Sequence, residues 1–200
     1  HPGVMNPDDY DLAGFAVGIV DKEKMLDPSM VAAGDVIISL QSSGLHSNGF
    51  SLVRKALDVE HAKLDEWNEE LGGELGGVLL QPTQIYVKPV LSAMEAAQIH
   101  GVSHVTGGGF YENIPRCLPK GMTAKIDKSA LRIDPIFRMI QRLGNIPERD
   151  MFNTFNMGTG MALIVDKNDA DKVRTLLLAA GQAPRIIGEV VPGDGGVELL

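Results

Sequence analysis

The stretch Leu40-Gln41-Ser42-Ser43-Gly44-Leu45-His46-Ser47-Asn48-Gly49-Phe50 joins two segments of opposite character. Before it, the apolar and β-branched run Asp35–Leu40 follows Gly34 and is typical of a buried strand. After it, apolar residues at 50, 53, 56 and 57 have helical spacing and predict a helix to about Val59. The first N–H groups of a helix lack partners and carry partial positive charge. A strand, a Gly/Ser loop and a helix start therefore predict an anion site.

The loop carries several side chains suited to a phosphorylated ligand. Hydroxyl and amide groups supply donors, and glycines let the backbone approach a phosphate closely. One alternative is that Ser47 or Asn48 merely caps the helix. His46 is a candidate for proton transfer, or a loop histidine that caps a neighbouring carbonyl. Because so many polar side chains crowd together, we favour a ligand loop with these binding residues: Ser43, Gly44, Ser47, Asn48 and Gly49.

A second stretch repeats this arrangement. Val102–Val105 predicts a strand and Phe110–Leu118 a helix, with Thr106, Gly107, Gly108 and Gly109 between them. Consecutive glycines are costly for folding, so a ligand that needs bare backbone is one explanation. A flexible connector, or glycines that hold positive φ for folding alone, are the others. Candidate binding residues here are Thr106, Gly107, Gly108, Gly109 and Asn113, and Glu112 is either a catalytic base or a partner for N–H groups of its own helix.

The remaining segments mix strands and helices without strict alternation, which predicts an α+β fold with a mixed sheet. Trp67 is expected to be a packing anchor, and Leu71–Gly77 a flexible loop. Further strands are expected at Leu12–Val20, Met122–Asp127, Ala162–Val165, Arg185–Val190 and Val197–Leu200, and helices at His61–Glu70 (continuing or following the first), Val87–Ala97, Pro135–Leu143 and from a cap at Asn168 through Ala180.

Composition narrows the function. The net charge of −8 and pI near 5.1 argue against nucleic acid and anionic membrane surfaces as partners. No apolar run has the roughly 18 residues of a spanning helix. Cys117 is the only cysteine, which excludes an intrachain disulfide and fits a cytoplasmic protein. The histidines form no metal-ligand pattern, so the metal ligands of this chain stay unknown.

Four motifs in order go beyond these arguments: residues 9–15, DYDLAGF; 42–50, SSGLHSNGF; 104–115, HVTGGGFYENIP; and 154–161, TFNMGTGM. Together they resemble the phosphoribosylformylglycinamidine cyclo-ligase (AIR synthetase) family. The resemblance covers almost the whole chain but only the C-terminal portion of the family's proteins. It implies that residues 1–11 are the remnant of an interdomain linker, and that residues 12–200 form a C-terminal domain with a three-layer arrangement.

The resemblance also implies an activity. The family's enzymes use ATP and Mg²⁺ to close the imidazole ring of formylglycinamidine ribonucleotide, so a phosphorylated small molecule and ATP are the expected ligands. In this family an N-terminal domain supplies most of the ATP site and the dimer interface, which implies a full-length homodimer and an inactive isolated chain. The alternatives are a non-catalytic module that binds phosphate ligands, or a related ATP-using enzyme of the same superfamily.

Overall fold

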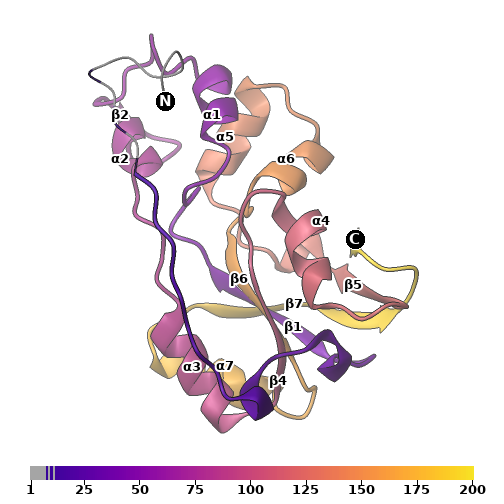
Figure 1. Ribbon diagram of the computed structural model, residues 1–200. Coiled ribbons are helices and arrows are strands. Elements are labelled where there is room, and N and C mark those ends of the chain that lie inside the picture. The colour runs from indigo at the N-terminus through magenta and orange to yellow at the C-terminus, as the bar shows by residue number, and fades with distance from the viewer. Residues whose placement is uncertain (1–7, 9, 11) are drawn as a thin grey trace.

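The computed structural model describes residues 8, 10 and 12–200. Its centre is a sheet with strand order β4-β6-β1-β7-β5-β8, in which only β5 and β8 are parallel, and Figure 1 shows helices on both sides of it. The expected mixed sheet is confirmed. The strands are β1 Val36–Gln41, β4 Ile99–His104, β5 Met122–Ile126, β6 Thr159–Val165, β7 Pro184–Pro192 and β8 Val197–Leu199, with β2 Trp67–Asn68 and β3 Gly73–Glu74 forming a separate small ribbon.

The helices fall into two groups separated by the sheet (Figure 1). α3 and α7 lie side by side on one face, and α4, α5 and α6 cover the other. The expected three-layer arrangement is therefore confirmed. The helices are α1 Phe50–Ala56, α2 Leu75–Leu79, α3 Val87–Ala96, α4 Gly109–Asn113, α5 Pro135–Leu143, α6 Glu148–Thr154 and α7 Ala170–Ala179, and short 3₁₀ turns span Lys22–Lys24, Pro28–Met30, Ile114–Cys117 and Lys128–Ala130.

Alternation along the central strands builds a core on each face of the sheet. In β1, Ile37 packs toward α4, α5 and α6, whereas Ile38 and Leu40 pack toward α3 and α7. In β6, Ile164 packs toward α4, α5 and α6, and Leu163 packs toward α3 and α7. Both strands are paired on each side, so every second side chain is buried in each direction and the runs read as continuously apolar.

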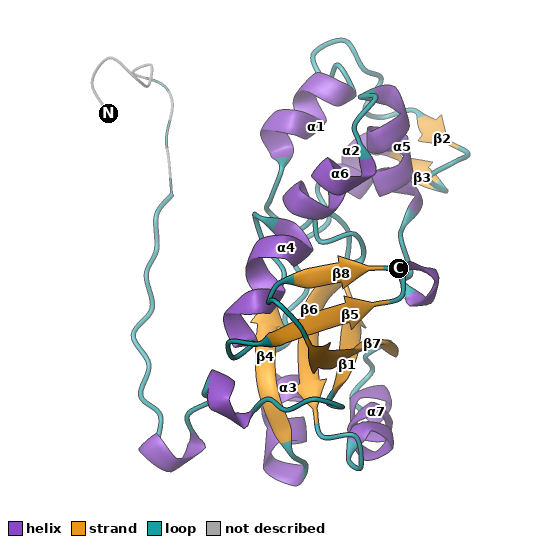
Figure 2. Cartoon of the chain, turned by 90° about the vertical axis from the view of Figure 1, so that its right-hand side faces the viewer, coloured by secondary structure: helices purple, strands orange, loops and turns teal. Residues whose placement is uncertain are grey.

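The expected strand at Leu12–Val20 is wrong. This stretch has no strand geometry, and Figure 2 shows it as a loop that stands clear of the sheet. Phe15 and Ile19 are almost fully exposed, at 94% and 101%. An apolar, β-branched run becomes a strand only where a sheet edge pairs with it, and no sheet of the described residues includes this run. The expected linker at 1–11 lies outside the described residues apart from Asp8 and Tyr10, so both proposed domain bounds stay predictions.

Several further expectations around α1 and α2 are corrected. α1 ends at Ala56, because Asp58 adopts a positive φ that breaks the helix, and His61–Glu70 forms turns and β2 instead of helix. Trp67 is 64% exposed and anchors no core. Residues 71–77 are not one flexible loop, since they hold β3 and the start of α2. There the Gly76 N–H donates to the Leu64 carbonyl at 2.7 Å, an approach that a larger residue would obstruct.

Elsewhere the elements match with shifted bounds. The helix expected at Phe110–Leu118 divides into α4 and a 3₁₀ turn, because Pro115 lacks the N–H that a longer helix needs. α7 is preceded by Asp169, and Asn168 does not cap it, because its side chain bonds Asp166. α6 was not expected at all. Its length of 7 residues is too short for a clear apolar period, although Met151 and Phe152 are buried.

Candidate functional site

The first polar loop, residues 42–49, connects the end of β1 to α1. Gly44, His46 and Gly49 all have positive φ, at 134°, 57° and 77°. Gly49 is the N-cap residue of α1 and no side chain caps the helix, so the alternative in which Ser47 or Asn48 caps it is wrong. A Cβ on Gly49 would lie 2.9 Å from Cδ1 of Phe155 and closer still to another ring atom. Glycine is therefore required here both by backbone conformation and by packing.

His46 braces this loop from inside. Its imidazole is buried, and Nε2 accepts a hydrogen bond of 3.2 Å from the Ser43 N–H. Neither ring nitrogen donates to a carbonyl in the described structure, so the alternative in which His46 caps a neighbouring carbonyl is wrong. A backbone amide can only donate, so Nε2 is unprotonated and the ring proton is on Nδ1. Burial, assisted by nearby His104, lowers the pKa of His46 from 6.5 to about 4. His46 is thus a neutral ring at pH 7, and Nδ1 has no hydrogen-bond partner in the described structure.

A segment that the sequence did not single out, residues 82–86, forms the second wall of the site. The Ser43 hydroxyl donates to the Pro82 carbonyl at 2.6 Å, and the Ser47 and Thr83 hydroxyls are 3.1 Å apart. The Tyr86 hydroxyl donates to the Gln41 carbonyl at 2.8 Å, at the point where the β1–β6 register shifts. Burial raises the pKa of Tyr86 above its usual value, so its hydroxyl keeps its proton.

The second glycine loop, Thr106–Gly109, follows β4 as expected. Gly108 and Gly109 have positive φ, at 89° and 54°, which supports the explanation that glycines are needed for folding. Gly107 differs from both, because its hypothetical Cβ would meet only Asn48 Oδ1, at 3.4 Å. The two glycine loops, more than 50 residues apart in sequence, therefore meet at Asn48 and Gly107.

Asn113 was expected to bind ligand, but its side chain serves the loop. It is buried, and its Nδ2 group donates to the carbonyls of Thr106, Gly107 and Gly109 at 3.3, 3.1 and 2.7 Å. Its Oδ1 accepts from the Thr106 hydroxyl at 3.2 Å. Glu112 is exposed, and its side chain lies over Gly108, 2.6 Å from that residue's hypothetical Cβ to the carboxyl carbon. Of the two, only Glu112 presents its polar group to solvent at the loop.

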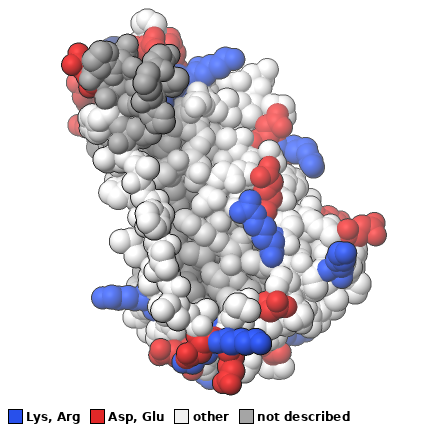
Figure 3. All heavy atoms as spheres, viewed as in Figure 1, with Lys and Arg blue, Asp and Glu red and all other residues white. Residues whose placement is uncertain are grey.

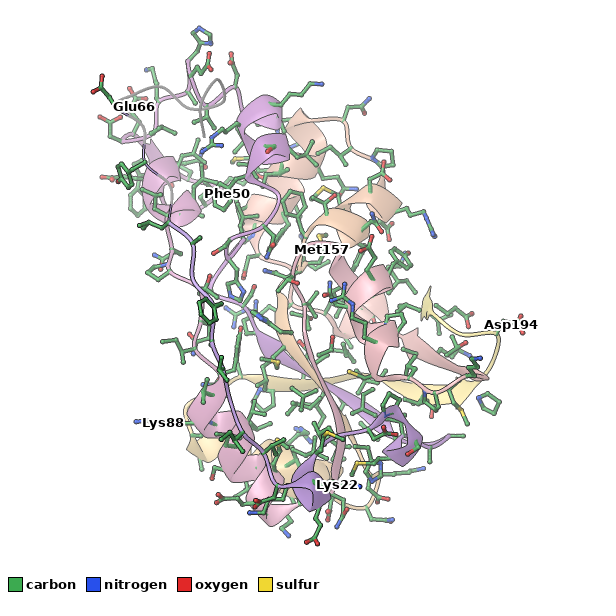
Figure 4. The ribbon with its side chains drawn as sticks, viewed as in Figure 1. Lys22, Phe50, Glu66, Lys88, Met157 and Asp194 are labelled. Atoms are coloured by element: carbon green, nitrogen blue, oxygen red, sulfur yellow. The ribbon has the colours of Figure 1, made fainter. Side chains whose placement is uncertain are left out.

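A third segment, Phe155–Gly160, which runs from the end of α6 into the first residues of β6, joins the other two. Asn156 donates from Nδ2 to the Gly44 carbonyl at 2.9 Å and accepts the Gly158 N–H on Oδ1 at 2.9 Å. A Cβ on Gly160 would overlap the Tyr86 hydroxyl and lie 2.6 Å from His46 Cε1. The sequence marked this stretch only as part of a family motif, through its Asn and Gly content. Figure 4 shows Met157, within it, and Phe50, at the start of α1, on neighbouring parts of the fold.

His104 is the solvent-facing histidine of the site. The rings of His46, Tyr86 and His104 have pairwise centroid distances of 6.2, 6.3 and 6.4 Å. His104 is exposed at the end of β4, yet partial burial against the neighbouring rings lowers its pKa. It is therefore mostly neutral at pH 7 and able to accept a proton. His104 opens the motif at residues 104–115 and flanks the glycine run, but it was not among the expected site residues.

Apart from the Glu112 carboxylate, the polar groups of the site are backbone N–H, hydroxyl, amide and imidazole groups. On the face shown in Figure 3, charged side chains lie at the upper and lower ends and to the right of the centre, and much of the surface between them is uncharged. Across the described residues there is no group of three or more His, Cys, Asp or Glu side chains placed to hold a metal ion. No helix in that part of the chain is long and apolar enough to cross a membrane. The site is thus suited to a small anionic ligand held by neutral donors.

The fold and these motifs place the chain in one family. Residues 32–199 match the family model described as AIR synthase related protein, C-terminal domain, and the chain belongs to that family. It is 51% identical over 199 residues to the phosphoribosylformylglycinamidine cyclo-ligase of Alkaliphilus oremlandii (strain OhILAs), covering 99% of this chain and 58% of the relative. The cyclo-ligase of Agathobacter rectalis is 47% identical over 201 residues, covering 100% of this chain and 59% of the relative.

The resemblance inferred from the motifs is confirmed, and the chain spans under three fifths of the length of these curated relatives. A solved structure, AaThiL complexed with AMPPCP and TMP, superimposes with a TM-score of 0.53 at 13% identity, over 87% of this chain and 50% of that chain. That likeness supports the α+β fold alone.

Proposed function

We propose that this chain is the C-terminal part of an ATP-dependent ligase that closes the imidazole ring of formylglycinamidine ribonucleotide to give aminoimidazole ribonucleotide. The observation that carries the proposal is the meeting of the family motifs at one place. Loops 42–49 and 106–109 touch at Asn48 and Gly107, and Asn156 ties the first loop to the third. Identity near 50% to curated cyclo-ligases over the whole chain supports the same reaction.

The site's donors suit the charge that this reaction develops. ATP transfers its γ-phosphoryl group to the amide oxygen of the substrate, the ring-forming nitrogen attacks the same carbon, and inorganic phosphate leaves as the ring closes. The phosphorylated oxygen and the ribose phosphate are both anionic. Donors that are already oriented stabilise such charge without reorganising, and the two loops supply N–H, hydroxyl and amide donors.

The residues present fit phosphate groups better than a metal ion. Mg²⁺ prefers six oxygen ligands, usually including carboxylates, and the loops present no cluster of them in the described structure. We therefore assign phosphate oxygens, and no Mg²⁺ ligand, to the two loops. A nucleotide partner is supported by AaThiL, which shares the fold and was solved with AMPPCP.

The roles of the titratable residues follow from exposure. His46 and Glu112 were the catalytic candidates, but His46 is buried with Nε2 occupied. Within the proposal, His46 holds the loop, and His104 or Glu112, which face solvent, transfer protons. The whole protein is proposed to be a cytoplasmic homodimer that pairs through the part of the relatives that this chain does not span.

The phosphate role is tested with the double variant Ser47→Ala, Asn48→Ala. Each lost hydrogen bond to a charged group costs about 1.5–3 kcal/mol, so affinity for inorganic phosphate should fall at least tenfold while the circular dichroism spectrum stays unchanged. Ser92→Ala with Asn153→Ala, two exposed positions away from the loops, is the matched control. Equal affinity in the two double variants would remove the loop from the ligand site.

Ring closure is tested by complementation. The chain is incubated with formylglycinamidine ribonucleotide, ATP and magnesium, with and without the remaining N-terminal segment of a curated relative, and aminoimidazole formation is followed. We expect turnover only in the complemented mixture, since misplacement of about 1 Å between reacting groups costs roughly a hundredfold. Phosphate-ligand binding without turnover under any condition would favour a non-catalytic binding module.

A further inference from the structure

We propose that Asn156 and Asn113 are positioning residues, each of which fixes the backbone of one glycine loop in its ligand-binding conformation before the ligand arrives. This inference rests on the proposed function only in taking the two loops as the place where phosphate groups bind. Both side chains are almost completely buried, at 2% and 3% exposure, so neither amide is free to contact ligand in this conformation.

Asn156 clamps the first loop to the third. β1 and β6 pair as far as Gln41 and Thr159, one further backbone hydrogen bond joins the Ser42 N–H to the Gly158 carbonyl at 2.9 Å, and beyond it the two segments diverge. Across the gap, Asn156 Nδ2 donates to the Gly44 carbonyl at 2.9 Å, and Oδ1 accepts the Gly158 N–H at 2.9 Å. One amide therefore continues the connection between the two segments after the strand ladder has ended. Without it, the Gly44 carbonyl would be buried with no donor, which costs about 1–3 kcal/mol.

Asn113 does the same within the second loop. Its Nδ2 lies within hydrogen-bond distance of three carbonyls, those of Thr106, Gly107 and Gly109, and its Oδ1 accepts the Thr106 hydroxyl. Loops of consecutive glycines have the largest conformational freedom to lose, so a ligand would otherwise supply that ordering free energy. With the carbonyls gathered around one buried amide, and the Gly109 N–H donating to the Thr106 carbonyl at 3.0 Å, the backbone of the loop is already ordered before a ligand arrives.

Only an amide can fill these positions, which gives a sharp test. Aspartate has the same shape as asparagine, but its ionised carboxylate has no proton to donate and would face carbonyl oxygens. A protonated aspartic acid restores one donor and one acceptor. Burial disfavours the charged form, so an introduced aspartate would have a raised pKa and would regain its proton on mild acidification. Asn156→Asp and Asn113→Asp are therefore switchable variants, and Asn153→Asp, an exposed position on α6, is the matched control.

The first measurement is amide hydrogen exchange in the 200-residue chain without ligand. At pH 8, N156D should raise exchange at Ser43 at least tenfold while leaving Gly109 near the wild-type rate, and N113D should do the reverse. Those amides are chosen because Ser43 donates to His46 and Gly109 donates to Thr106 within their respective loops. Ile38, in the middle of the sheet, should be unchanged in both variants.

The second measurement is sulfate affinity, since sulfate is an anion that does not titrate in this range. At pH 8 both variants should bind sulfate at least tenfold more weakly than wild type or N153D. At pH 5.5 the ratio to wild type should recover to within about threefold. A residue that only stabilises the fold would lower the melting temperature and leave the sulfate affinity of the folded protein unchanged at both pH values.

The outcomes separate the two proposals. If wild type binds no sulfate, the phosphate role of the loops fails, but the exchange pattern still decides whether the asparagines hold them. Exchange that rises equally at Ser43, Gly109 and Ile38, or variants that stay unfolded at pH 5.5, would overturn the positioning role. So would sulfate affinities of N156D and N113D that match N153D at pH 8.

Discussion

Gly109→Ala should be among the most destabilising single-methyl substitutions in this chain. Gly109 has a φ of +54°, where an alanine costs about 1–2 kcal/mol relative to the right-handed region. The new Cβ would overlap the Phe152 carbonyl oxygen, and it would lie 2.7 Å from that carbonyl's carbon and 3.0 Å from the Phe155 carbonyl oxygen. These are backbone atoms of α6 and its C-cap, so they yield only if the α4–α6 contact moves apart.

Forced overpacking of this kind costs about 1–3 kcal/mol. Adding the backbone strain gives a total of about 2–5 kcal/mol. For a protein of this size, a central value of about 3 kcal/mol corresponds to a fall in melting temperature of about 6–12 °C. Urea unfolding followed by circular dichroism measures the free energy, and an unchanged m-value would show that the native and unfolded states keep their extent of exposed surface.

The neighbouring glycines supply the controls. Gly107→Ala should cost under about 1 kcal/mol, because its Cβ would meet only Asn48 Oδ1 at 3.4 Å and its φ is not positive. The cost of Gly108→Ala should fall between these two, since its φ is +89° and the Glu112 carboxyl group can move aside, although Glu112 Cβ, at 2.7 Å, can shift only with the backbone of α4. If Gly109→Ala is as stable as Gly107→Ala, the close approach to α6 does not constrain this loop and the reasoning fails.

Three further results are expected. The pKa of His46 is lowered from 6.5 to about 4. The unfolded chain therefore binds more protons than the folded chain between these pH values, and stability falls as the pH drops through this window. Urea unfolding at pH 7 and pH 4 should show that wild type loses up to about 3 kcal/mol more than His46→Gln. Tyr86→Phe removes the donor to the Gln41 carbonyl and should cost about 0.5–1.5 kcal/mol, and a melting temperature equal to wild type would contradict that bond. Trp67→Ala should change stability by less than about 0.5 kcal/mol, because the ring is 64% exposed, and a larger loss would restore the packing-anchor hypothesis.

The elements that the sequence predicted best are those with local signals at both ends. α5 has the expected bounds because Pro135 starts it, Gly144 ends it, and apolar residues between them recur at helical spacing. Leu12–Val20 fails for the opposite reason. Its apolar, β-branched composition indicates a strand, but whether a strand forms depends on an available sheet edge, which no local pattern records. The Gly-rich stretch 71–77 fails because contacts to Leu64 order it from a distance.

In the candidate site, too, local patterns predicted some features, whereas others depend on contacts between distant parts of the chain. Loop composition identified both glycine loops, but could not show that residues 82–86 lie against them, since the hydroxyl contacts of Ser43 and Ser47 span more than 35 residues. Nor does composition separate residues that face the ligand from residues that hold the loop. Asn48 and Asn113 carry the same amide group. The Asn48 amide lies beside Gly107 of the second loop, whereas the Asn113 amide is surrounded by carbonyls of the second loop, to which it belongs.

The neighbouring glycines of the second loop show why a motif of this kind has no single explanation. Gly109 is fixed by contact with α6, Gly108 by its backbone conformation, and Gly107 by neither. At Gly107, opposite Asn48, a Cβ would meet neither a severe clash nor a strained backbone. Approach of a ligand is therefore the better explanation for glycine at this position. A phosphate held between the two loops would meet the bare backbone there. We therefore expect Gly107 to be the glycine of this run that a ligand approaches, and Gly108 and Gly109 to be needed for the turn.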